Sequence, residues 1–401
     1  MSLKPQQISE FRDQVASEWR DNIAVFWLRY APDEKHGGFH GWITNDLRID
    51  EQAEKGIILN SRILWTFAHA YKLYKNDEFR SFAHRAFNYL TDHFIDREYG
   101  GVFWTVDYQG QPLDMKKRPY AQAFALYGLT EFYLATGEAK ALAEARAIFD
   151  LLENRTRDHV NEGYFETFER DWTLAEDQRL SDVDQDEKKS MNTHLHVLEA
   201  YAALARATND GGVKERLRAV ITLFLDRIIH PEQFYLQMFF DEMWTCKSDH
   251  ISFGHDIEGS WLLCEAAEVL ADAELLAQVR GVSWKMAQSV HDRGLDADGS
   301  LLYEADAGGI IDDEKHWWTQ TEAVVGFVNA YELSGQEHFL LAALRVWEFI
   351  SRNIIDKQNG EWFWKTSRSG VPDLEMPKLS QWKCPYHNGR MCFEIGHRLG
   401  S

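Results

Sequence analysis

Cysteine is scarce in this sequence. The 401 residues include four cysteines, with no CxxC pair and no zinc-ribbon spacing among them: Cys246, Cys264, Cys384 and Cys392. A disulfide framework and a structural zinc site are therefore excluded, and reduced thiols in a cytoplasm are expected.

Positive charge and long apolar runs are also in short supply. Lys and Arg total 43 against 64 Asp and Glu, a formal charge of −21, which would repel phosphate backbones and anionic lipid headgroups. Charges interrupt every apolar run well before the length of a membrane span, and charged residues at helical intervals in residues 1–30 exclude the apolar core of a signal peptide. We therefore expect a cytoplasmic protein with no nucleic-acid or membrane partner.

Aromatic residues are plentiful, and many of them recur in a repeated signature. They make up 13% of the chain. A glycine or asparagine beside alternating aromatics is typical of a tight turn between two short strands. The signature occurs six times, and its fourth copy lacks the glycine: HGGFHGW at 36–42, YGGVFWTV at 99–106, NEGYFETF at 161–168, FYLQMFFDEMW at 234–244, DGSLLYEA at 298–305 and NGEWFWKT at 359–366.

Two kinds of helix alternate with these signatures. Charged amphipathic helices are predicted before them, at 10–30, 77–94, 140–158, 213–229, 272–293 and 337–355. Helices much poorer in charge are predicted after them, at 60–74, 120–136, 192–208, 255–270, 318–334 and 387–399. One-sided helices belong outside and nearly all-apolar ones inside. The pattern predicts an all-α fold, an (α/α)6 barrel of six inner and six outer helices forming one domain, residues 1–401, with short β-hairpins at one end. The alternative is an open solenoid of helical repeats.

In a closed barrel, the N-termini of all six inner helices would face one mouth. Their first two turns carry polar or aromatic side chains: Asn60, Arg62, Tyr120, Gln122, Asn192, His196, His255, Glu258, Trp318, Glu322 and His387. The preceding loops add Asp184, Trp382 and Trp244. Aromatic faces suit sugar rings, and carboxylates, amides and an arginine suit hydroxyls, so we expect a carbohydrate pocket.

Several polar residues near this mouth also have simpler interpretations. His194 lies two residues from His196, about 200° around the helix, so the pair cannot hold a metal, and His194 is interpreted as structural. His255 and Glu258 either share a hydrogen bond or begin a metal site. Without an HExxH motif or a clustered third ligand, no metal is expected. The acidic run 182–187 is interpreted as a solvated loop from which Asp184 reaches a substrate.

Four ordered motifs carry a family resemblance: KSMNTHLHVLEAY at 189–201, SFGHDIEGSWLL at 252–263, KHWWTQTEAVVGF at 315–327 and WKCPYHNGR at 382–390. Together they resemble the N-acylglucosamine 2-epimerase superfamily, most closely its cellobiose 2-epimerase branch, whose members are (α/α)6 barrels. The resemblance implies that His255 and His387 form an acid/base pair, with His196 as a third essential histidine. It also implies a set of residues that hold the sugar: Arg62, Tyr120, Asn192, Glu258, Trp318, Glu322 and Trp382, with Asp184 and Trp244 from the loops.

The chemistry expected of such a site is inversion of C2 in an aldose or in the reducing-end glucose of a disaccharide. Two histidines, one on each face of the enediolate, suit this reaction, and Arg62 would stabilise its negative oxygen without a metal or other cofactor. The alternatives are aldose–ketose isomerisation of the mannose-to-fructose type, N-acylglucosamine 2-epimerisation, pure sugar binding, and glycoside hydrolysis by Glu258 and Glu322. A monomer or homodimer acting on a small sugar is expected.

Overall fold

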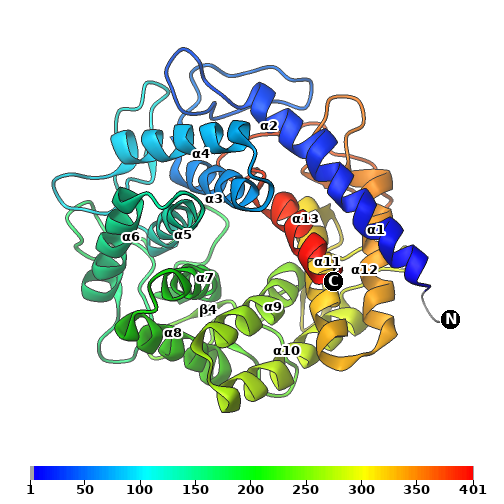
Figure 1. Ribbon diagram of the computed structural model, residues 1–401. Coiled ribbons are helices and arrows are strands. Elements are labelled where there is room, and N and C mark those ends of the chain that lie inside the picture. The colour runs from blue at the N-terminus through cyan, green and yellow to red at the C-terminus, as the bar shows by residue number, and fades with distance from the viewer. Residues whose placement is uncertain (1–3, 401) are drawn as a thin grey trace.

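The predicted helices are present and form two concentric rings in the computed structural model, which describes residues 4–400 (Figure 1). The inner ring contains α3 (Ile57–Tyr74), α5 (Pro119–Thr136), α7 (Met191–Thr208), α9 (Phe253–Leu270), α11 (Trp317–Ser334) and α13 (Tyr386–Arg398). The outer ring contains α1 (Pro5–Glu18) with α2 (Ala24–Tyr30), α4 (Asp77–Tyr89), α6 (Ala139–Leu151), α8 (Gly211–Leu223), α10 (Ala273–Arg293) and α12 (Glu337–Phe349). The predicted domain extent, 1–401, includes residues outside the described range and stays a prediction.

The outer helices contain π-helical turns, which shift the register of their buried faces. One turn joins α1 to α2, and four others end outer helices: η1 (Trp19–Ile23), η2 (Leu90–Phe94), η3 (Leu152–Thr156), η4 (Phe224–Ile228) and η5 (Ile350–Ile354). The buried residues of α4 include Phe79, Phe82, Ala83 and Ala86, which follow the three- and four-residue spacing of one helix face. The inner helix α5, in contrast, is buried without interruption from Pro119 to Phe132. This difference places α5 between the outer ring and the barrel axis.

The ring is closed, which excludes the open solenoid. Each inner helix packs against the next one along the chain, and α13 also packs against α3 and against α1. Figure 1 shows α13 completing the inner circle beside α3. The first and last units of the chain are therefore neighbours. Within residues 4–400, no helix is both long and apolar enough to cross a membrane.

The aromatic signatures form the predicted turns, but most of the strand pairing differs from the prediction. Each turn after an outer helix is closed by an isolated β-bridge, as between Ile95 and Val102. The longer pairings join neighbouring units: β1 (Lys55–Gly56) with β2 (Thr105–Val106), β3 (Lys189–Ser190) with β4 (Phe239–Phe240), β5 (Ile251–Ser252) with β6 (Glu304–Asp306), and β8 (Lys315–His316) with β9 (Lys365–Thr366). Within residues 4–400, only β6 and β7 (Gly309–Asp312) form a hairpin of named strands inside one unit. A bridge between Ile43 and Leu379 joins the sixth unit to the first.

The fourth copy of the signature forms its turn without glycine. Phe234 has a φ of 56°, in the left-handed region that Gly100 occupies in the second copy with a φ of 75°. A side chain is therefore tolerated at this position, at some conformational cost.

A buried ion pair fixes the loop of five units. In each, a lysine shortly before the inner helix meets an aspartate that follows the outer helix: Lys55 with Asp33, Lys117 with Asp96, Lys189 with Asp158, Lys315 with Asp296 and Lys378 with Asp356. The same aspartates accept hydrogen bonds from turn amides; Asp158, for example, accepts from Val160 and Asn161. In the fourth unit, His230 Nδ1 accepts the hydrogen bonds from the turn amides that an aspartate accepts in the other units. Ile251 occupies the position of the lysine. Each pair sits at the mouth end and sets where an inner helix begins.

Candidate active site

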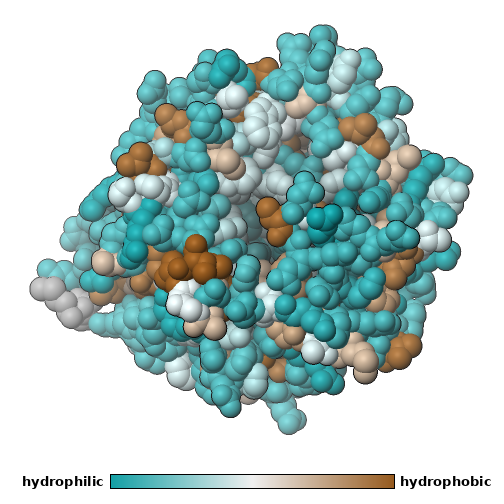
Figure 2. Space-filling view, turned by 180° about the vertical axis from the view of Figure 1, so that it is seen from behind, coloured by the Kyte–Doolittle hydropathy of each residue, from teal (hydrophilic) through white to brown (hydrophobic). Residues whose placement is uncertain are grey.

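A cavity of about 670 Å³ opens at the N-terminal ends of the inner helices. Figure 2 shows this face of the molecule, with a recess near its centre that is surrounded mostly by hydrophilic residues. The volume is typical of a pocket for a small ligand. Ten residues selected from the sequence line it: Arg62, Tyr120, Asp184, Asn192, His196, His255, Glu258, Trp318, Trp382 and His387.

Two predicted substrate-binding residues do not line the cavity. Trp244 is buried in the loop packing: its Nε1 donates to the Asn161 carbonyl over 2.9 Å and its ring packs on His194. The prediction for Trp244 is wrong because its loop turns this ring into the protein. Glu322 lies behind His387, accepting from His387 Nδ1 over 2.6 Å and from Trp261 Nε1 over 3.1 Å, so it reaches the cavity only through the imidazole.

Two other polar residues expected at the mouth make hydrogen bonds to backbone groups and do not line the cavity. Gln122 both accepts from Val102 N and donates to Val102 O, and the Asn60 amide donates to the Gly56 carbonyl of its own helix. The fourth residue of three further inner helices makes the same contact to a turn amide: His194 to Tyr164, Asp256 to Leu236 and Gln320 to Leu301. The structural interpretation of His194 is therefore confirmed.

Three histidines from different inner helices meet at the cavity, each with its own partner. His255 Nδ1 is 2.8 Å from Ser252 Oγ, His196 Nδ1 is 3.2 Å from Glu199 Oε2, and His387 Nδ1 is 2.6 Å from Glu322 Oε1. The Trp318 ring packs against both His255 and His387, with centroid separations of 4.7 and 5.6 Å. His255 and His387 thus pack against the same aromatic ring.

Removal from water favours the neutral form of all three imidazoles, of which His196 and His387 are buried and His255 is partly buried at the cavity wall. It lowers the pKa of His255 and of His196 to about 3, and lowers that of His387 well below its ordinary value. The carboxylates respond in the opposite direction, since burial raises the pKa of both Glu258 and Glu322. At neutral pH the site therefore offers imidazole bases ready to accept a proton.

Arg62 brings a positive charge to the cavity wall. Its guanidinium lies 4.2 Å from the Phe124 ring centroid and donates to Tyr120 Oη over 3.1 Å. Its Nε has no hydrogen-bond partner within residues 4–400. Part of the donor capacity of this buried cation is thus free to meet a negative oxygen.

The acidic loop is more than a solvated segment, because much of it forms one wall of the cavity. Leu180, Asp182 and Asp184 are among its lining residues, and Asp184 accepts hydrogen bonds from the amide and the hydroxyl of Ser181. Gln178 anchors the loop by accepting from the amides of Glu166 and Thr167, 3.3 Å each. The loop is held at its base and faces the cavity at its tip.

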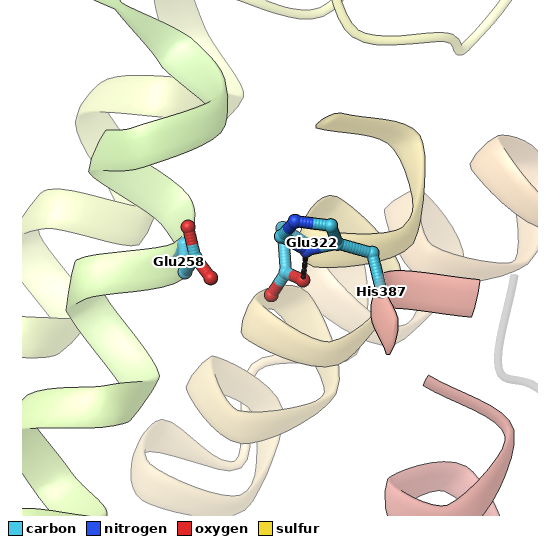
Figure 3. Close-up of side chains that lie close together, drawn as sticks. All are labelled: Glu258, Glu322 and His387. Carbon is cyan, nitrogen blue, oxygen red and sulfur yellow. Dashed lines mark hydrogen bonds and ion pairs between the residues drawn. The ribbon is translucent and has the colours of Figure 1, made fainter. Parts of the chain in front are cut away.

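Glu258, Glu322 and His387 converge from three helices (Figure 3). Their ligand atoms lie within 4.8 Å of one another, which is the spacing of a metal site. Arg390, however, donates from one nitrogen to both carboxylates, over 2.5 Å to Glu258 and 2.7 Å to Glu322. A guanidinium thus already supplies the positive charge at this cluster, which agrees with the metal-free mechanism predicted from the sequence. That mechanism stays a prediction.

Arg390 and Glu199, which contact the histidine partners behind the cavity, are two residues that the sequence interpretation left without a role; the cavity lining adds others, among them Tyr303 and His316. Glu199 continues the polar stripe of Asn192 and His196, and Arg390 follows His387 by three residues, a spacing that puts both on one helix face. Helical spacing was therefore the signal available for both. What it could not show is which carboxylates from other helices surround the guanidinium.

Comparison with known proteins places the chain among sugar epimerases. The family model for N-acylglucosamine 2-epimerase matches residues 37–387. Cellobiose 2-epimerase from Bacteroides fragilis is 44% identical over 92% of this chain and 94% of that protein, and the enzyme of the same name from Dictyoglomus turgidum is 40% identical over 93% and 95%. The solved structure of cellobiose 2-epimerase from Bacillus thermoamylovorans superposes with a TM-score of 0.93, at 37% identity, covering 97% of this chain and all of that one. The chain belongs to the N-acylglucosamine 2-epimerase family.

Proposed function

We propose that this protein inverts C2 of the reducing-end glucose in a 1,4-linked disaccharide such as cellobiose, converting it to mannose. The observation that carries the proposal is the meeting of three neutral histidines and one arginine around a single cavity. The relatives named cellobiose 2-epimerase, at 44% and 40% identity over nearly the whole chain, support the substrate class. A disaccharide is comparable in size to the ligands that pockets of this volume enclose.

The aromatic rings suggest where the sugar rings lie. Trp318, between His255 and His387, would support the ring whose C2 reacts. Trp382, which packs near Trp104 and Tyr120, offers a second apolar face within the same cavity for the other ring. Asp184 on the loop wall would accept hydrogen bonds from sugar hydroxyls. The disaccharide would then extend from the histidines toward the loop.

The reaction requires an open-chain aldehyde and a base on each face of C2. One neutral imidazole removes the C2 proton, and the C2–H electron pair moves into the C1–C2 bond as the carbonyl oxygen becomes negative. The Arg62 guanidinium would stabilise that oxygen. The second histidine first takes a proton from solvent, so it enters this step as an imidazolium. It donates that proton to C2 from the opposite face and becomes neutral, while the electron pair on the oxygen forms the carbonyl again. His196 lies beside Tyr120 and is placed to move protons among the sugar oxygens during ring opening.

The two bases differ in their partners. His387 is backed by the carboxylate of Glu322, which stabilises the imidazolium formed when the ring takes a proton. His255 is backed by the hydroxyl of Ser252 at the start of α9, where the helix dipole disfavours the imidazolium. His387 is thus oriented by an anionic partner and His255 by a neutral one, while burial lowers the pKa of both.

Exchange of the C2 hydrogen tests the proposal directly. Cellobiose incubated with the protein in deuterated water should acquire deuterium at C2, followed by proton NMR. His255→Ala and His387→Ala should each reduce exchange by about 10³-fold or more, because each removes one acid/base group. His291→Ala, which removes a histidine from outer helix α10, serves as the matched control and should exchange at the wild-type rate. Undiminished exchange in a folded His255 or His387 variant would contradict the mechanism.

Product analysis separates the remaining functions. Glucosyl-mannose indicates 2-epimerisation, glucosyl-fructose indicates aldose–ketose isomerisation, and free glucose indicates hydrolysis; N-acetylglucosamine is supplied as a separate substrate. Hydrolysis is disfavoured because Glu258 and Glu322 share one arginine nitrogen and Glu322 does not line the cavity, so they cannot flank a glycosidic bond. The cytoplasmic location and the monomeric or homodimeric state remain predictions.

A further inference from the structure

Arg390 lies behind the cavity, among carboxylates from three other inner helices. Its side chain is 2% exposed, and it does not line the cavity. One terminal nitrogen donates to Glu258 and Glu322, and the other donates to Glu199 and to Tyr386 Oη. The guanidinium therefore joins carboxylates from α7, α9 and α11 to helix α13.

Aromatic rings hold this guanidinium in place. Its carbon lies 4.7 Å from the Trp261 ring centroid and 4.3 Å from that of Tyr386. Trp261 also donates to Glu322 Oε2, so the same tryptophan contacts the arginine and orients one of its carboxylates. Planarity and a fork of fixed donors make arginine, and not lysine, suited to span several acceptors at once.

Each of the three carboxylates contacts the reactive side of the site. Glu199 Oε2 lies 3.2 Å from His196 Nδ1, and Glu322 Oε1 lies 2.6 Å from His387 Nδ1. Glu258 lines the cavity itself. One side chain is thus linked, through these carboxylates, to histidines of α7 and α13 and to a carboxylate that lines the cavity.

We propose that Arg390 is a positioning residue for the reaction: it sets the directions of Glu199, Glu258 and Glu322, and through them the ring orientations of His196 and His387. The inference rests on the proposed epimerase function of this cavity. Arg390 touches no substrate, so its effect passes entirely through the carboxylates. Small displacements of acid/base groups reduce rates by about 10²-fold, because reacting atoms must stay within a narrow range of distance and angle.

Charge gives Arg390 a second effect that can be separated from the first. Charged and titratable groups from five of the six inner helices, α3, α7, α9, α11 and α13, face His387: Arg62, His196, Glu258, Glu322 and Arg390. The carboxylates favour its protonated form, and the two arginines oppose it. Loss of the guanidinium charge should therefore raise the pKa of His387, so that a larger fraction of the enzyme lacks a neutral base at a given pH.

Two substitutions separate geometry from charge. Arg390→Lys keeps the charge but cannot span the three carboxylates, so kcat should fall by about 10²-fold, with KM changing much less and the acidic limb of the pH–rate profile staying near its wild-type position. Arg390→Met removes the charge as well, so the same fall in kcat should be accompanied by an acidic limb shifted to higher pH. The measured quantities are kcat, KM and C2-hydrogen exchange with cellobiose from pH 3 to 8, a range that includes the acidic limb.

The matched control lies on the same helix. Arg398 pairs with Glu332 and Glu394 over 2.6 and 2.9 Å, and it contacts none of the three site carboxylates. Arg398→Met should lower thermal stability while leaving kcat and the pH profile as in the wild type. If Arg390→Met does not fold, Arg390→Lys still carries the comparison, because it retains the buried charge.

The outcomes distinguish this inference from the proposed function. Wild-type protein that exchanges no C2 hydrogen with any of the tested sugars overturns the function itself, and with it this role for Arg390. Active wild type with a folded Arg390→Lys whose kcat is within threefold of it overturns the positioning role alone. The same holds if kcat falls in Arg398→Met as far as in the Arg390 variants, because the loss would then follow stability.

Discussion

Asp256 is a buried carboxylate that accepts a hydrogen bond from a turn amide. In three other units, an amide side chain or an imidazole accepts the equivalent bond. Asp256 accepts one hydrogen bond, from Leu236 N over 2.7 Å, where Gln122, His194 and Gln320 bind the equivalent amides. Burial raises its pKa to about 8. The folded protein therefore holds a proton on Asp256 that the unfolded chain has already lost at neutral pH.

Asp256→Asn should remove a pH dependence from stability. A folded-state pKa raised above the unfolded value contributes stability that is fully present below about pH 4 and is lost as pH rises through about 8. Between pH 6 and 8 the wild type should lose about 2 kcal/mol relative to Asp256→Asn, which still accepts from Leu236. Urea unfolding at both pH values measures this difference. A difference that does not change with pH would contradict a raised pKa for Asp256.

The buried histidines predict an unusually acid-tolerant enzyme. Burial lowers the pKa of His255 to about 3 and that of His387 well below its ordinary value, so both stay neutral as pH falls from 7 to 5. An imidazole with the ordinary pKa of about 6.5 would be neutral in roughly 76% of molecules at pH 7 and roughly 3% at pH 5, giving about a 25-fold loss. We expect kcat/KM at pH 5 to stay within about threefold of its value at pH 7. A full loss of about 25-fold that reverses on return to pH 7 would show that the histidines titrate normally.

The sequence predicts which residues line the cavity wherever their position depends on helix geometry alone. Residues in the first two turns of the inner helices, such as Arg62 and His255, could be assigned to the mouth because every inner helix starts there. Trp244 and Glu322 could not be placed, since a loop conformation buries one and an imidazole covers the other. For Arg390, the sequence shows only that it lies three residues after His387. Its contacts with carboxylates of three other helices are shown by the structure.

At the scale of the elements, the buried Lys–Asp pairs predict a compensated double substitution. Lys189 Nζ lies 2.8 Å from Asp158 Oδ2 and also donates to the carbonyls of Glu162 and Glu242. Lys189→Ile should destabilise the protein by about 3–5 kcal/mol, because it leaves a buried carboxylate unpaired. Adding Asp158→His copies the fourth unit, whose imidazole binds the turn amides without a lysine.

The double variant should recover at least half of that loss, as measured by urea unfolding. His230 accepts from Glu232 N and Gln233 N over 3.3 and 3.2 Å, so an imidazole meets the same demand of the turn as the Asp158 carboxylate. Asp158→His alone is the control, because it leaves Lys189 buried without its anion. A double variant that is no more stable than Lys189→Ile would contradict this prediction. It would mean that replacing the Lys–Asp pair by isoleucine and histidine does not by itself account for the stability of the fourth unit.

Helices were predictable to within a few residues, whereas strand partners were not. Amphipathic spacing and capping residues such as Asn76 and Gly137 act within one segment, so the sequence shows them directly. A strand of two residues has too little pattern to indicate its partner. Lys55–Gly56 pairs with the signature of the following unit because the barrel brings that unit alongside. The buried Lys–Asp pairs could not be predicted, because lysine and aspartate are common at protein surfaces. The structure shows that the pair is buried in five of the six units.

The whole molecule is a ring, so the position of its chain ends should matter little. The strand pairings run from each unit to the next, and the bridge between Ile43 and Leu379 continues them from the sixth unit to the first. Helix α1 also packs against α13, so the first and last helices of the described residues are neighbours. An open array would instead depend on its terminal units as caps.

A circular permutant tests this closure. The new chain would begin at Glu138, which caps the N-terminus of α6, and end at Gly137, which caps the C-terminus of α5, so both caps are kept. About 15 Gly and Ser residues, spanning roughly 20 Å on average, would join the original ends. We expect kcat/KM within about threefold of the wild type, because every bridge and inner-helix contact can still form. The control carries the same linker inserted between Gly137 and Glu138 of the normal chain. An inactive or unfolded permutant beside an active control would contradict this expectation. It would mean that the covalent link between units 2 and 3 is required, and that the non-covalent contacts around the ring cannot replace it.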